Sequence, residues 1–127
     1  MDFREMQTDG ANLVKGYSPG ELRINEECYR ESLVLFRESM WRGWLPERST
    51  DLEARHLEPL AKAGVEVLLI GTGDRLRFPD PAVTAPLVNS RIGVEAMDTP
   101  AACRTYNLLM GEDRLVAAAL FPTEHGG

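Results

Sequence analysis

A glycine-bounded apolar run places the strongest constraint on the fold. Five of the six residues over 65–70 are apolar, where a half-exposed strand would alternate polar and apolar positions. A strand that helices cover on both faces is apolar throughout, as in parallel sheets. Gly64 ends the preceding segment, and Gly71, Thr72 and Gly73 form a tight exit turn. We therefore predict the central strand of an α/β domain.

Length and composition favour one cytoplasmic domain. A chain of 127 residues has the common domain size, and 43% hydrophobic with 27% charged residues is typical of a soluble globular protein. No apolar run approaches the roughly 20 residues of a membrane span, and residues 1–5 lack a signal-peptide pattern. We expect a single domain over residues 11–122, with a disordered amino terminus at 1–10 and a disordered tail at 123–127.

Charge and cysteine spacing argue against several classes of ligand. Twenty acidic and fourteen basic residues give a net charge of −6, which repels phosphate backbones. Cys28 and Cys103 lie far apart without a metal-ligand spacing, and His56 and His125 add none. We predict no nucleic-acid partner, no metal and no cofactor.

The amino-terminal third carries strand signals. Residues 18–20 form a Ser-Pro-Gly turn between extended pieces at 11–17 and 21–25, which predicts a β-hairpin. Residues 33–36 are apolar enough for another central strand, which residues 37–39 then break.

The middle of the chain predicts a helix with an uncertain start. Thr50 and Glu53 fit a capping box, so the helix would begin at Thr50. Pro59 would clash with the carbonyl four residues earlier. The helix therefore either kinks or begins near Arg55, and Gly64 ends it.

Two aspartates with nearby prolines mark helix starts in the last third. Asp80 precedes Pro81, and Asp98 precedes Pro100 by two positions. The predicted elements are a short helix at 82–91, a strand at 92–97, a helix at 100–110 and a strand at 114–121. The longer helix would bury Ala102, Cys103, Tyr106 and Leu109.

A ligand site, if the protein has one, is expected at the exit turn of the central strand. Strand ends converge there, and the helix after Thr99 would offer free amides to an anion. The candidate ligand residues are Gly71, Thr72, Gly73, Asp98, Thr99, Arg104 and Asn107. The alternative is that these residues only cap and pin helices. We also expect a partly buried ion pair that joins Arg104 or Arg114 to Glu95, Asp98 or Glu112.

A protein-interaction surface is the other candidate site. Trp41 and Trp44 could form an exposed aromatic patch or cap one edge of the core, and Leu108 is a further candidate. Cys103 and His56 could pair as nucleophile and base, but a cysteine at helical core spacing is usually buried. Since no catalytic set is recognisable, we expect a non-enzymatic protein-interaction domain. The alternative is a small-molecule or anion-binding protein, or an unrecognised enzyme, that uses the exit turn and the start of the helix at Thr99.

The order of several short strings resembles a known family. Its most specific parts are Met-Asp-Thr at 97–99 and Ala-Ala-Cys-Arg-Thr-Tyr-Asn at 101–107, supported by Leu-Ile-Gly-Thr-Gly at 69–73. Over residues 10–122 the chain is similar to the Mth938-like family, which includes the mitochondrial respiratory complex I assembly factor 3. Phe36 and Arg91 depart from the pattern.

The resemblance implies a three-layer α/β domain with a mixed central sheet, helices on its faces and an extra amino-terminal β element. It implies no established catalysis. It also implies protein partners, since the mitochondrial relative binds another assembly factor and nascent subunits of the complex. The chain lacks an Arg-rich presequence, so it looks like a bacterial member.

Overall fold

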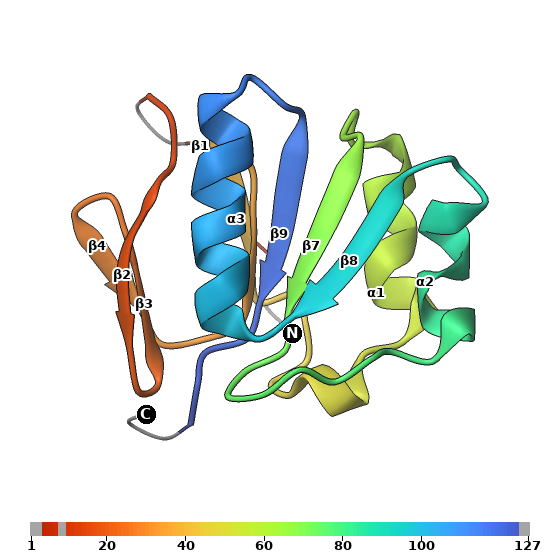
Figure 1. Ribbon diagram of the computed structural model, residues 1–127, viewed down its shortest axis with the longest axis horizontal. Helices are drawn as coiled ribbons and strands as arrows, with labels where there is room; N and C mark the ends of the chain where they lie inside the picture. Colours follow the sequence, from red (N-terminus) through yellow and green to blue (C-terminus); the bar gives the residue numbers. More distant parts are fainter. Residues whose placement is uncertain (1–3, 8–9, 125–127) are drawn as a thin grey trace.

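The main sheet of the computed structural model is mixed (Figure 1). The model describes residues 4–7 and 10–124. Within this part of the chain, the main sheet has six strands in the order β1-β6-β5-β9-β7-β8. In that order the strands span Arg4–Gln7, Ser39–Arg42, Leu33–Leu35, Val116–Leu120, Val67–Gly71 and Gly93–Met97. β9, β7 and β8 run parallel, whereas the pairs that involve β1, β6 and β5 are antiparallel. The predicted mixed sheet is confirmed.

β7 is the central strand that the apolar run predicts. All five of its residues are buried, between β9 on one side and β8 on the other. The strand begins two residues later than predicted and includes Gly71. Gly64, just before it, has a φ of +78°, a left-handed conformation that favours glycine.

Helices cover both faces of the main sheet, which gives the predicted three layers. α3, Thr99–Gly111, lies on one face. The other face carries the short segments α1, η2 and α2, which span Ala54–Leu57, Glu58–Lys62 and Pro81–Val88. A further short segment, η1, spans Ser49–Asp51 and lies near the carboxyl end of β7, where Ser49 Oγ donates to Thr72 O at 3.3 Å. The alternation of β9 shows the division, since Ala118 packs in the core that contains α3 and Ala117 in the core on the other face.

In the described part of the chain, a second sheet of three strands is the extra amino-terminal element. β2, β3 and β4 span Val14–Ser18, Glu21–Ile24 and Glu27–Tyr29 and are antiparallel. Figure 1 shows this sheet beside α3, on the side away from β7 and β8. Its Leu22 and Ile24 are buried in the same core as α3. The predicted hairpin is therefore confirmed, and β4 extends it.

The segment around Pro59 is more broken than a single helix. α1 begins at Ala54, close to the later of the two predicted starts, and a 3-10 turn that contains Pro59 follows it. The capping box predicted for Thr50 and Glu53 is wrong, because the backbone amide of Glu53 donates to His56 Nδ1 at 2.9 Å instead. Proline lacks the amide that a continuous helix would need at this point.

Two short strands were not anticipated. β6 follows closely on β5 as its antiparallel neighbour, and β1 pairs with the outer edge of β6. Residues 4–7 thus form a strand where the sequence predicts disorder, because backbone pairing along an open edge needs no local apolar pattern. Of the other residues predicted to be disordered, 1–3, 8–9 and 125–127 lie outside the described residues.

Candidate functional site

Thr99 joins three elements at the carboxyl end of the parallel strands. Its hydroxyl accepts a hydrogen bond from Gly73 N at 2.8 Å and donates to Phe121 O. Its own amide donates to Gly73 O at 3.0 Å. Thr99 is fully buried, so the exit of β7, the exit of β9 and the start of α3 meet around one side chain.

The first amides of α3 already have partners within the chain. Asp98 is the N-cap, as predicted, and its carboxylate accepts from Ala101 N at 2.8 Å. Ala102 N donates to Asp98 O at 3.0 Å, Thr99 N donates to Gly73 O, and Pro100 has no amide to offer. These bonds account for Asp98 and Thr99 structurally. A ligand role for the two residues stays a prediction.

Thr72 and Gly71 are also held by internal contacts. The buried Thr72 hydroxyl donates to Arg75 O at 2.7 Å and accepts from Arg77 N at 3.1 Å, which fixes the loop after β7. Gly71 lies against α3, where an added Cβ would come within 3.0 Å of Ala102 Cβ. The glycine therefore permits close packing of helix on strand.

Arg104 and Asn107 lie away from this turn, against the small sheet. Arg104 Nη1 donates to the Tyr17 hydroxyl at 3.0 Å. Asn107 pairs with the backbone of Val14 through two bonds, of 2.9 Å from Val14 N and 2.8 Å to Val14 O. The structure thus brings five of the seven candidate ligand residues together and uses the other two to attach β2 to α3.

A hollow of about 370 Å³ opens where β7 and β9 end. The chain leaves β7 for α2 on one face of the sheet and reaches β9 through α3 on the other. The hollow lies outside the carboxyl ends of two parallel strands, where ligands of open α/β sheets bind preferentially. The lining residues are Glu47, Arg48, Ser49, Thr50, Thr72, Gly73, Asp74, Arg75, Arg77, Phe121, Pro122 and Glu124.

Three arginines of this hollow were missed by the sequence prediction. Arg48, Arg75 and Arg77 belong to two loops that are far apart in the sequence, and loops without a pattern give no sign of converging. Over residues 10–124, none of the three forms an ion pair with a carboxylate. A smaller cavity of about 230 Å³ adjoins it, shares Arg77 and is floored by Ile70.

Cys103 and His56 do not form a catalytic pair. Cys103 lies on α3 and His56 on α1, in the cores of opposite sheet faces. Burial raises the pKa of the Cys103 thiol to about 12, so the thiolate is scarce near neutral pH. Burial lowers the pKa of His56, whose Nδ1 accepts the amide of Glu53.

The three candidate interaction residues do not share one surface. Trp41 is only 9% exposed and packs beside Phe36, with ring centroids 5.1 Å apart. Trp44 is half-buried, and its indole nitrogen donates to His56 O at 2.8 Å. Both tryptophans belong to the core on the α1 face, whereas Leu108 is 61% exposed on α3.

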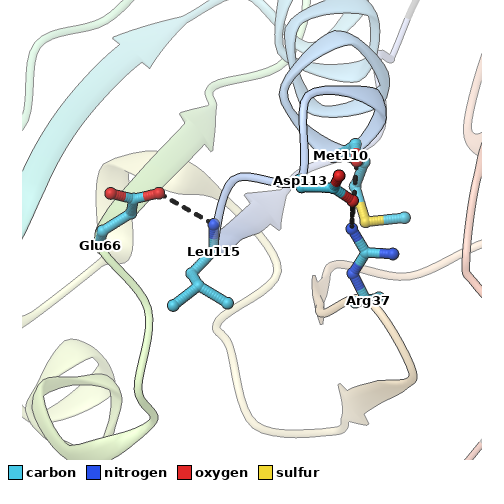
Figure 2. A network of polar contacts seen from close by, with 5 residues as sticks. All are labelled: Arg37, Glu66, Met110, Asp113 and Leu115. Carbon is cyan, nitrogen blue, oxygen red and sulfur yellow. Dashed lines mark hydrogen bonds and ion pairs between the residues drawn. The ribbon is translucent and has the colours of Figure 1, made fainter.

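The ion pairs predicted for two arginines have other partners. Arg114 Nε lies 2.8 Å from Glu66 Oε1, and both side chains are about half exposed. Figure 2 shows Glu66 also accepting the amide of Leu115, at 3.0 Å. Arg104 has the Tyr17 partner described above. Sequence proximity favoured the wrong carboxylates because the start of β9 lies beside the start of β7, far away in the chain.

The loop after α3 is held by a second arginine (Figure 2). Arg37 donates to Met110 O at 3.1 Å and lies 3.3 Å from Asp113 Oδ1. A cation at a helix carboxyl end satisfies its last carbonyls and suits the helix dipole. This contact secures the end of α3 and leaves the strand-end hollow untouched.

Within the described residues, no cluster of three or more histidine, cysteine or acidic side chains is placed to hold a metal ion. The same part of the chain contains no helix with the length and apolar character that a membrane crossing requires.

The fold defines a class of protein before any comparison does. It is a three-layer α/β domain with a mixed main sheet and a small amino-terminal sheet packed beside α3. The chain belongs to the family described as protein of unknown function (DUF498/DUF598), whose model matches residues 14–121. The chain is also similar to a solved Mth938-like domain, so the resemblance seen in the sequence is confirmed.

Curated relatives are named for an assembly role. The chain is 32% identical over 128 residues to the NADH dehydrogenase (ubiquinone) 1 alpha subcomplex assembly factor 3 of Danio rerio, covering 99% of this chain and 73% of the relative. The protein of the same name from Xenopus tropicalis is 36% identical over 77 residues, which cover 61% of this chain and 42% of the relative. The matched segment thus spans less than half of the frog protein's length.

Solved structures from two Bordetella species share the fold. A crystal structure from Bordetella parapertussis superposes with a TM-score of 0.83 at 39% identity, covering 90% of this chain and 98% of that one. A Mth938-like domain from Bordetella pertussis gives a TM-score of 0.77 at 33% identity, covering 95% and 94%.

Proposed function

We propose that this chain is a non-enzymatic protein-interaction domain that assists the assembly of a respiratory membrane complex. The observation that carries the proposal is the 32% identity, over 99% of the chain, to a relative named as an assembly factor of NADH dehydrogenase. The cell compartment that the proposal favours is the cytoplasm, facing the membrane where such a complex is built.

The distribution of polar and apolar groups supports a binding role over catalysis. The hydroxyls and carboxylate at the predicted turn are engaged in internal hydrogen bonds. Large apolar side chains remain outside, with Phe78 81% exposed and Leu76 44% exposed on the loop after β7. Exposed apolar side chains that lie close together, as these two do along the loop, are more typical of a protein-binding site than isolated ones.

Removal of the protein from its native cell is expected to lower the amount of assembled NADH dehydrogenase. An assembly factor acts on subunits before they are complete, so a tagged copy of the chain should co-purify with free subunits or another assembly factor. Native gels stained for NADH dehydrogenase activity measure the assembled enzyme. A second respiratory complex serves as the internal control and should stay unchanged.

Re-expression of the wild-type chain should restore the amount of assembled NADH dehydrogenase, which would show that the loss is due to the missing chain. A Leu115→Ala variant, which changes an exposed side chain on the far side from the strand-end hollow, should restore it equally. Unchanged enzyme in the deletion strain, with no subunits on the tagged chain, would contradict the assembly role.

The arginine-lined hollow supports a second candidate function, the binding of a small anion. Three guanidinium groups line a hollow at the strand ends in a chain of net charge −6, although Glu47, Asp74 and Glu124 line the same hollow. Guanidinium groups match phosphate and carboxylate oxygens in pairs. This candidate keeps Thr72 and Gly73 from the predicted set and adds the loop arginines.

Titration with inorganic phosphate is expected to shift the amide resonances of Gly73, Arg75 and Arg77 in a saturable way. Sodium chloride at matched ionic strength gives the control for screening. An Arg77→Gln variant should weaken the response, since it removes one guanidinium and keeps a polar side chain. Shifts that do not saturate, or that chloride reproduces, would rule out this site.

A further inference from the structure

β8 forms one edge of the main sheet, and its outer side is open. The amide of Gly93 donates to Glu66 O at 3.0 Å, and Met97 O accepts from Thr72 N at 2.8 Å. In a parallel ladder alternate residues bond to the same neighbour. Gly93, Glu95 and Met97 therefore pair with β7, and the backbone groups of the residues between them face outward.

The outward residues are Val94 and Ala96. Within residues 10–124, no backbone or side-chain hydrogen bond reaches their amides or carbonyls from outside the sheet. Unpaired backbone groups in a row favour one kind of occupant, an additional extended strand. The geometry of the edge thus specifies the conformation of what binds there.

An apolar groove runs beside this edge. Its lining residues are Phe78, Pro79, Pro81, Thr84, Val94, Glu95 and Ala96. The side chains of Val94 and Ala96 turn toward the α2 face, where they are half-buried against the core. Phe78, at 81% exposure, forms the outer wall of the groove. A strand added to β8 would place every second side chain on this apolar surface.

The charge of Glu95 indicates which side chains an added strand would carry on its other face. Glu95 turns its side chain to the opposite face, is exposed, and lies in no ion pair within residues 10–124. A basic side chain opposite it would form a favourable cross-strand pair, whereas an acidic one would repel. The net charge of −6 acts in the same direction.

We propose that the free edge of β8 binds an extended segment of a partner protein in which apolar residues alternate with basic ones. The apolar residues cover Phe78, Val94 and Ala96, and a lysine or arginine lies opposite Glu95. The inference rests on the proposed function, because it names the surface and the partner chemistry of that interaction domain. Self-pairing centred on Glu95 would instead bring two carboxylates together.

An acetylated, amidated hexapeptide of alternating valine and lysine is the probe, and its valine and glutamate counterpart is the matched control. The valine-lysine peptide is expected to slow hydrogen exchange at the amides of Val94 and Ala96 and to shift their resonances saturably. Glu95→Lys should weaken its binding by roughly twofold to fivefold, the range of a cross-strand charge pair, and favour the glutamate peptide.

Two further variants test the groove and the backbone separately. Phe78→Ala should weaken binding by roughly tenfold, because the peptide loses an aromatic wall. Ala96→Pro removes one outward amide without touching the ladder to β7 and should abolish binding. Leu115→Ala, also at an exposed apolar residue, is the control and should bind as the wild type does.

Three outcomes would overturn the inference. Slow exchange of Val94 and Ala96 in the free protein would mean that the edge is already occupied, and sedimentation would show whether a second copy occupies it. Equal binding of both peptides, or binding that Phe78→Ala leaves unchanged, would place the contact elsewhere. Since the peptide assay uses the purified chain, its result is independent of the deletion experiment, and either idea can fail alone.

Discussion

Replacing Gly71 with alanine is expected to destabilise the domain by about 2 to 3 kcal/mol, the upper part of the range for an overpacked core position. The new Cβ would lie 3.0 Å from Ala102 Cβ and 3.1 Å from both Leu120 Cδ2 and Thr99 Cα. The last contact is with backbone, so α3 as a whole would have to move away from β7. Urea unfolding measures the loss of free energy.

Two other glycines provide matched controls for this substitution. A Cβ at Gly111, inside the last turn of α3, or at Gly16 would meet nothing within 4 Å, and neither residue has a positive φ. Gly111→Ala should stabilise by up to about 1 kcal/mol through helix propensity, and Gly16→Ala should change little. Equal stability of Gly71→Ala and wild type would show that Gly71 serves the turn and not the packing of α3.

The contrast among these glycines shows what the sequence could predict. The apolar run before Gly71 predicted β7, because a strand buried on both faces shows a local sequence pattern, here five apolar residues of six. The caps at Asp80 and Asp98 were equally local, and both aspartates accept the expected amides. The packing role of Gly71 could not be predicted in this way, because it depends on contact with α3, a distant segment of the chain.

Elements that depend on distant neighbours were not predictable in the same way. β6 carries Trp41 in a segment with no strand pattern, and it becomes a strand because β5 and β1 flank it. The strand-end hollow likewise gathers Arg48 with Arg75 and Arg77 from separate loops. The local sequence of neither loop indicates that the two loops lie together. Thr72 and Gly73 were predicted because they follow a recognisable strand.

Replacing Thr99 with valine is expected to destabilise the domain by about 2 to 6 kcal/mol. Valine matches the shape of threonine but removes the hydroxyl, which leaves Gly73 N and Phe121 O buried without partners. Each unsatisfied buried group costs roughly 1 to 3 kcal/mol. Because the two groups end β7 and β9, amide hydrogen exchange should rise at the exits of both strands as well as in the first turn of α3.

Thr99→Ser is the matched control, since it keeps the hydroxyl and loses one methyl group. It should cost only about 1 kcal/mol, and exchange at the strand exits should stay close to that of the wild type. The pair of variants separates the two interpretations of this residue, because a ligand contact would not be needed for folding. If Thr99→Val unfolds at the same urea concentration as Thr99→Ser while phosphate binding is lost, Thr99 belongs to the anion site and not to the framework that joins β7, β9 and α3.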